Sequence, residues 1–143
     1  MSLEVLDPLA HRALQALMQA ETSVRRVLAV ELEREGVSAA GFSALVVLTT
    51  AGGSLELRIL RRRLGWSKAN ATEVTDTLES RGLVRRRRLE SDRRAVALDL
   101  TMEGRSVVER LFPGHADRVT SAFASLDDEE KRNLAYICRK LAA

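Results

Sequence analysis

The chain has 143 residues, of which 45% are hydrophobic and only 3% aromatic, so it fits one domain of ordinary size with an aliphatic core. No stretch approaches about 18 consecutive apolar residues, and the N-terminal stretch MSLEVLDPLAHR lacks a basic region followed by an apolar one. We therefore expect neither a membrane span nor a secretory leader, and a cytoplasmic protein. The single cysteine excludes an internal disulfide. His11 and His115 are the only histidines that could complete a zinc site with it, so we expect no metal site.

The net charge of +3 conceals a strong asymmetry along the chain. Residues 58–94 hold 12 Lys or Arg against 5 Asp or Glu, a local charge of +7, so the flanking segments together are acidic. Such a concentration of positive charge is typical of a surface that meets phosphate. The alternative is a merely solvated face, which would not need to coincide with a structural motif.

A long amphipathic helix is predicted at the start of the chain. Asp7 and Pro8 form an N-cap and first-turn pair, and the helix can run over 9–35 until Gly36 ends it. Its apolar positions, spaced to form one stripe, are Leu14, Leu17, Val24, Leu28 and Leu32. A helix of roughly 40 Å exceeds what a small domain needs, so we expect a second subunit to share the stripe. Packing wholly on its own chain is the alternative.

Two shorter helices are expected next. Ser38 can cap a helix whose core side chains include Phe42, Leu45 and Leu48, and residues 51–54 (AGGS) break it. A helix over 55–64 then carries Leu57, Leu60 and Leu64 at helical spacing. Gly65 and Trp66 make a tight connection to the following element, which is the pattern of a helix-turn-helix.

The second helix of this motif is predicted over 67–81. Ser67 is an N-cap, Gly82 ends the helix in the left-handed conformation, and a rod of roughly 22 Å fits a DNA major groove. The periodicity then changes to that of strands over 84–89 and 94–100, joined by a polar tip. A helix followed by an arginine-rich hairpin indicates a winged helix-turn-helix.

The rest of the chain is expected to be helical. Thr101 caps a helix that Pro113 and Gly114 should interrupt, because proline removes an amide hydrogen and glycine eases a bend. Asp127 and Glu130 have the spacing of a capping box for the last helix. Cys138 lies in the apolar stripe of that helix, so we expect a buried structural thiol.

The string LESRGLVRRRRLESDRRAVALDLTMEGR resembles the MarR (multiple antibiotic resistance regulator) family, whose pattern is LExxGLVxR, then DxR at the wing tip, then LTxxG. The resemblance implies one domain over 1–143 that is mainly α with a small antiparallel β wing. Residues 37–101 would form the winged helix-turn-helix DNA-reading layer, and residues 1–36 and 102–143 a helical dimerisation layer. In the family, a two-fold dimer places both recognition helices in successive major grooves of a pseudo-palindromic site.

The expected DNA contacts fall on the recognition helix and the wing. Side chains early in the helix can reach base edges or phosphates, and wing arginines should hold phosphate. The resemblance implies that Arg94 enters the minor groove and that Asp92 can hold its guanidinium. The full set of expected DNA-binding residues is Ser67, Lys68, Asn70, Thr72, Thr75, Arg86, Arg88, Asp92, Arg93 and Arg94.

Three residues depart from the family pattern. Glu73 brings a carboxylate to the recognition helix, where it either faces away from phosphate or accepts from a cytosine amino group. Arg61 replaces the small alanine that is usual in the preceding helix, so the local packing must differ. Trp66 replaces a smaller apolar residue, and we expect it to pack in the core rather than to stack on a base.

The predicted function is that of a sequence-specific DNA-binding transcriptional regulator, acting as a homodimer on double-stranded DNA without a cofactor. By resemblance it is a repressor released by a small phenolic or lipophilic effector, with a pocket near His11, Arg12 and Phe42. No nucleophile with a base at motif spacing and no glycine-rich phosphate loop supports an enzyme. The alternatives are a sequence-tolerant architectural DNA binder, and a protein-interaction winged helix that would not need the local charge of +7.

Overall fold

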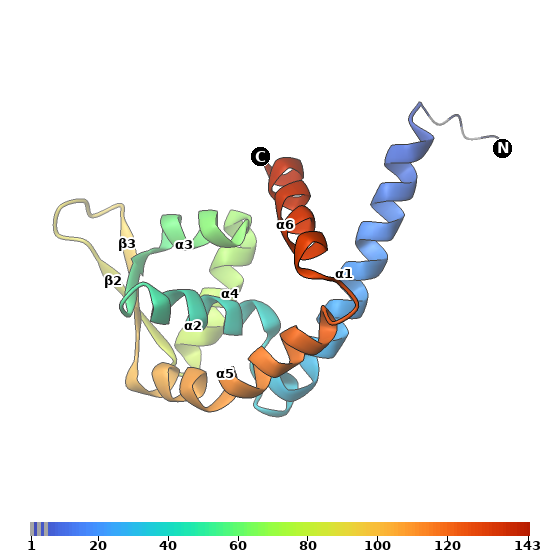
Figure 1. The fold of residues 1–143 in the computed structure, drawn as a ribbon. Coiled ribbons are helices and arrows are strands. Elements are labelled where there is room, and N and C mark those ends of the chain that lie inside the picture. The colour runs from blue at the N-terminus through green and yellow to red at the C-terminus, as the bar shows by residue number, and fades with distance from the viewer. Residues whose placement is uncertain (1, 3, 5) are drawn as a thin grey trace. The chain divides into compact units, whose positions relative to one another are not determined.

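The computed structural model describes Ser2, Glu4 and residues 6–143. Met1, Leu3 and Val5, and with them part of the stretch in which a leader was sought, lie outside the described residues. In chain order the elements are α1 (Pro8–Arg34), α2 (Ala39–Thr50), β1 (Ser54–Glu56), α3 (Leu57–Leu64), α4 (Lys68–Ser80), β2 (Val84–Arg88), β3 (Val96–Leu100), α5 (Met102–Ala122) and α6 (Asp128–Ala142) (Figure 1).

This architecture confirms a mainly α fold with a small antiparallel sheet. The chain forms two compact units, a winged unit over 31–114 and a helical unit made of 1–30 and 115–143. Helices α1 and α5 each contribute residues to both units. No helix in the described part of the chain is long and apolar enough to cross a membrane.

The core of the winged unit is aliphatic, as the low aromatic content predicts. Leu45 and Leu48 on α2, Leu60 on α3 and Leu98 on β3 are fully buried. Trp66 packs against this cluster and is partly buried, in keeping with the expected packing role. Helices α2, α3 and α4 therefore share one core with the sheet, which fixes the helix-turn-helix against the wing.

The sheet has the order β1-β3-β2, with both pairs antiparallel. Strand β1 corrects the prediction of a helix over 55–64. Leu55 pairs with Leu98, and α3 begins only at Leu57. The helical spacing of the leucines is real, but a strand of three residues is too short to leave a period in the sequence. Pairing with β3 satisfies its backbone polar groups.

Helix ends follow the predicted capping chemistry. The carboxylate of Asp7 accepts from the amide of Ala10 at 3.0 Å, and the hydroxyl of Ser38 from Gly41 at 3.0 Å. The carboxylate of Asp127 and the side chain of Glu130 form the complete capping box of α6. These local signals set the helix starts at the residues that the sequence indicates.

Helix α5 corrects a second prediction, because it runs through Pro113 to Ala122 without the expected interruption. Proline removes only one amide from the helical ladder. Val108 and Leu111 are buried in the winged unit, so packing holds the helix on the N-terminal side of Pro113. The chain leaves the helix only at the turn after Ala122.

The helical unit buries little of its apolar surface. Helix α6 has no buried residue, and its exposed side chains include Tyr136, Ile137 and Leu141 at 61%, 59% and 69%. On α1, Leu14 and Met18 are 52% and 61% exposed. Cys138 is also exposed on α6, so the expectation of a buried thiol is wrong for the single chain. Two amphipathic faces are thus left without cover within this unit.

Candidate nucleic-acid interface

The first turns of α4 present the side chains that the sequence marks for base contact. The hydroxyl of Ser67 accepts from the amide of Asn70 at 3.1 Å, which fixes the start of the helix. Lys68, Asn70 and Thr72 are exposed, and the Thr72 hydroxyl donates to the carbonyl of Lys68 at 3.0 Å. A capped helix end with exposed polar side chains is suited to enter a groove.

Thr75 does not belong to this surface. It is 1% exposed, on the core side of α4 with Ala71 and Leu78, and its hydroxyl has no hydrogen-bond partner in the described structure. The prediction that Thr75 contacts DNA is wrong, because the apolar side of the helix is wide enough to include this residue. We therefore remove Thr75 from the expected DNA contacts.

Two of the four consecutive wing arginines are occupied by acidic partners. Arg86 donates to Glu79 at 2.8 Å and to Asp76 at 2.6 Å, both on α4. Arg87 donates to Asp99 on β3 at 2.9 Å. The expectation that Arg86 contacts DNA does not fit this geometry, since its guanidinium is engaged within the protein. Arg85 and Arg88 are exposed as well, and among the described residues neither forms an ion pair with a carboxylate.

These pairs also shift the acidity of their carboxyl groups. The backbone amide and then the guanidinium of Arg86 hold the pKa of Glu79 below its ordinary value. A hydrogen bond from Arg87 is the largest cause that lowers the pKa of Asp99; burial opposes it, and a hydrogen bond from Ser54 adds to the lowering. Both carboxylates therefore stay ionised and neutralise wing arginines at neutral pH.

The tip of the wing is shaped by Asp92. Its carboxylate accepts from the backbone amide of Arg94 at 3.0 Å, and its carbonyl from the amide of Ala95 at 2.9 Å. The sequence predicted instead that Asp92 holds the guanidinium of Arg94. The observed contact is that of an Asx turn, which sets the backbone of the tip. Arg93 and Arg94 are both exposed there.

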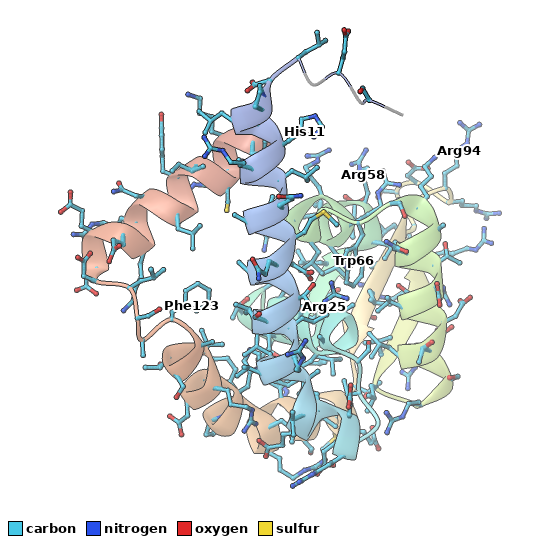
Figure 2. The ribbon with its side chains drawn as sticks, turned by 90° about the vertical axis from the view of Figure 1, so that its right-hand side faces the viewer. His11, Arg25, Arg58, Trp66, Arg94 and Phe123 are labelled. Atoms are coloured by element: carbon cyan, nitrogen blue, oxygen red, sulfur yellow. The ribbon has the colours of Figure 1, made fainter. Side chains whose placement is uncertain are left out.

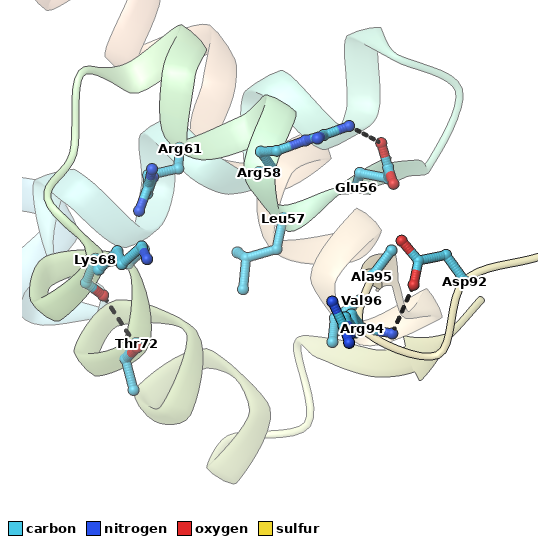
Figure 3. A pocket seen from close by; sticks show the side chains of 11 residues that line it. Glu56, Leu57, Arg58, Arg61, Lys68, Thr72, Asp92, Arg94, Ala95 and Val96 are labelled. Carbon is cyan, nitrogen blue, oxygen red and sulfur yellow. Dashed lines mark hydrogen bonds and ion pairs between the residues drawn. The ribbon is translucent and has the colours of Figure 1, made fainter.

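A cleft separates this tip from the helix-turn-helix. It has a volume of about 570 Å³ and lies between α3, the start of α4 and the wing (Figure 3). Leu57 points into its middle, with Arg61 and Lys68 on one side and Arg94 on the other. Figure 2 shows Arg58 and Arg94 toward the same end of the winged unit. Arg58 and Arg61 were not among the expected DNA contacts. The arginine at position 61, where the family usually has alanine, was the one sequence signal that pointed to this helix.

The expected effector residues lie in different environments. His11 and Arg12 are exposed on α1, in the helical unit. Phe42 is 1% exposed and belongs to the core of the winged unit. The effector pocket remains a prediction. In the described residues, no group of three His, Cys, Asp or Glu side chains could hold a metal ion.

The sequence was compared with family models and with known proteins. The model of the MarR family matches residues 37–96, which include α2 to the start of β3. The transcriptional repressor MprA of Escherichia coli K12 is 33% identical over 111 residues, which are 77% of this chain and 63% of MprA. The chain thus spans less than two thirds of that relative. The transcriptional repressor MdtR of Bacillus subtilis is 30% identical over 91% of this chain and 81% of its own length.

The fold also matches solved structures. The MarR family regulator Sco3205 from Streptomyces coelicolor, solved in complex with DNA, superposes with a TM-score of 0.85 at 28% identity. The match covers 99% of this chain and 90% of that one. The agreement therefore extends to the helices on both sides of the winged unit, beyond the residues that the family model matches.

Proposed function

The chain belongs to the MarR family of transcriptional regulators, and on this premise we propose that it is a sequence-specific DNA-binding repressor that acts as a homodimer on a pseudo-palindromic operator. The observation that carries the proposal is the exposed start of α4, with Lys68, Asn70 and Thr72 beside an arginine-bearing wing tip. Helix α4 would read the major groove, and the tip with Arg93 and Arg94 the adjacent minor groove.

Charge supports DNA as the partner. Residues 58–94 carry the local charge of +7, and the acidic side chains that pair with Arg86 and Arg87 lie on α4 and on β3. The exposed cations Lys68, Arg88 and Arg94 are left for phosphate. Phosphate contacts position the protein and make binding sensitive to salt, whereas Asn70 can pair bidentately with adenine and specify sequence.

Dimer formation is supported by the uncovered apolar faces of the helical unit. Leu14 and Met18 on α1 and Ile137 and Leu141 on α6 are more than half exposed in the single chain. Soluble monomers rarely leave large apolar surfaces in water. A second copy of the chain would cover these faces and give the two-fold symmetry that a pseudo-palindromic site requires.

The proposal also includes repression as the direction of regulation and release from DNA by a ligand. MprA and MdtR are named as repressors, which supports the sign of regulation. Release by a small phenolic or lipophilic effector rests on the family resemblance, with His11, Arg12 and Phe42 as the residues to test. A transcriptional regulator has to reach chromosomal DNA. We therefore also propose that the protein is located in the cytoplasm.

Selection from a random duplex pool tests the proposal. A dimeric reader should enrich an inverted repeat with half-sites about one helical turn apart. If each subunit neutralises roughly 4 or 5 phosphates, the slope of log K against log salt should be about −7 to −9. An architectural binder would enrich no sequence, and a protein-interaction winged helix would give a slope shallower than about −3.

Asn70 provides the matched variant. Asn70→Ala removes a neutral donor and acceptor, so the salt slope should stay unchanged while about 1 to 3 kcal/mol of discrimination at one base pair per half-site disappears. Ser80→Ala, at the far end of the same helix, is the control and should change neither quantity. Unchanged discrimination in Asn70→Ala would contradict base reading by Asn70, and an equal loss in Ser80→Ala would show a general disturbance of α4 rather than a lost base contact.

A further inference from the structure

The cleft between α3 and the wing concentrates cations from three elements. Arg58 and Arg61 come from α3, Lys68 from the start of α4 and Arg94 from the wing tip. Its floor is apolar, with Leu57 pointing into the middle (Figure 3). A cavity with a cationic rim and an apolar floor matches a ligand that carries an oxyanion on a carbon framework, as a sugar-phosphate strand does.

The carboxylates that also line the cleft are engaged. Glu56 accepts from Arg58 at 3.5 Å, and Asp92 from the backbone amide of Arg94 at 3.0 Å. The Arg58 pair is long and 72% exposed on the arginine side, so it is weak. Across the part of the chain that the structure describes, the side chains of Arg61, Lys68 and Arg94 form no ion pair. The cleft therefore has positive charge available for an anion.

The position of the cleft decides which anion it meets. If α4 enters a major groove and the wing tip the neighbouring minor groove, one sugar-phosphate strand must separate the two elements, because adjacent grooves of a duplex are divided by a strand. That strand has to cross the space between α4 and the tip, which is the cleft. This step rests on the proposed function.

We propose that the cleft is a backbone clamp, in which Arg58 and Arg61 of α3 bind the phosphodiester strand between the major and minor grooves of each half-site. Lys68 at the start of α4 holds the same strand from the major-groove side, and the wing tip with Arg94 borders it on the minor-groove side. Arg58 and Arg61 are three residues apart, which places them on one face of α3. The first helix of a helix-turn-helix crosses the DNA backbone, and the clamp assigns the contact in this chain to Arg58 and Arg61.

Helix α3 supplies its own controls. Arg62 and Arg63 are exposed arginines on the same helix that do not line the cleft. A general effect of net charge would be the same for all four arginines, whereas a clamp distinguishes Arg58 and Arg61 from Arg62 and Arg63. Long-range attraction between the protein and DNA is also screened by salt, so a salt dependence alone does not show a bound phosphate. The comparison of the four arginines separates the two effects.

The experiment measures operator affinity against salt for single alanine variants. Arg61→Ala should flatten the slope by about one unit per subunit, as should Arg58→Ala, with base discrimination unchanged. Arg62→Ala and Arg63→Ala should leave the slope within error of the wild type. Arg61→Lys should restore the slope, which shows that charge rather than packing of the arginine is at stake. Equal slopes for all four alanine variants would overturn the clamp.

A second arm locates the phosphate. Neutral methylphosphonates are placed one at a time along the operator, and the position between the two grooves should weaken the wild type but not Arg61→Ala, a non-additive cycle. Additive losses at every position would overturn the clamp while leaving specific binding intact. A wild type that prefers no sequence and shows a slope shallower than about −3 would instead overturn the proposed function, and the clamp with it.

Discussion

Arg86 uses its backbone amide and its guanidinium to bind one carboxylate, that of Glu79, with both N···O distances at 2.8 Å. A second guanidinium nitrogen reaches Asp76 at 2.6 Å. These bonds join the first strand of the wing to the last turns of α4. The two elements proposed to enter adjacent grooves are therefore connected directly, apart from their common core.

The first prediction concerns this connection. Arg86→Ala should lower the free energy of unfolding by about 1 to 2 kcal/mol, because charge-assisted bonds are lost but Glu79 is 38% exposed and solvent screens the pair. Urea unfolding at fixed protein concentration measures the change. Arg85→Ala removes the neighbouring exposed arginine, which forms no ion pair among the described residues, and should cost far less. Equal losses for both variants would show that the connection contributes nothing.

The second prediction explains the glycine of the LTxxG pattern. A Cβ at Gly104 would collide with the backbone carbonyl oxygen of Leu83 and lie 2.8 Å from Cδ1 of Leu100. Gly104→Ala should therefore destabilise the protein by at least about 1 to 3 kcal/mol, although alanine is the better helix former. Ser106→Ala, exposed on the same helix, is the control in thermal unfolding. A more stable Gly104→Ala variant would contradict the close approach.

The third prediction is a dependence of stability on pH. The pKa values of Glu79 and Asp99 are lowered on folding from ordinary values of 4.5 and 3.8. Their contribution is fully present above those ordinary values and is lost as the pH falls through the lowered ones. The midpoint of thermal unfolding should thus fall below about pH 4.5, and Glu79→Gln should differ from the wild type at pH 7 but little at the acid end. A difference that is constant with pH would refute the assignment.

Local signals predicted most of the fold. Capping residues such as Ser67 and Asp127 act within three or four residues of themselves, so their effect is readable from the chain alone. Strand β1 and the passage of α5 through Pro113 were missed because both depend on contacts distant in sequence. Leu55 becomes a strand residue through Leu98, and helix α5 is held by burial of Leu111 in the winged unit.

In the candidate site, too, the sequence predicted the features that depend on local pattern and missed those that depend on the fold. Exposure at Lys68 and Arg94 follows from helical and hairpin positions, whereas the sequence cannot show that Arg86 turns back to Glu79. Arg58 and Arg61 become visible only when α3 lies beside the wing in three dimensions. A run of arginines indicates that phosphate is bound, and the fold decides which arginines are available to bind it.

The last prediction tests how Asp92 supports the wing tip. Its carboxylate accepts from the backbone amide of Arg94, so the bond requires an oxygen acceptor at this position but no negative charge. Asparagine offers the same carbonyl acceptor and also favours such turns. Asp92→Asn should accordingly bind operator at least as well as the wild type, since it also removes a carboxylate near phosphate.

Asp92→Ala should weaken binding, because the turn loses its acceptor and Arg94 is no longer aimed at the groove. Once Arg94→Ala has removed the charge, the tip has less to position, so the double variant should be little worse than Arg94→Ala alone. Operator titrations across salt, followed by the fluorescence of Trp66, measure the wild type and the four variants. If Asp92→Asn is as defective as Asp92→Ala, the carboxylate acts through its charge on the guanidinium, and the turn geometry is not its role.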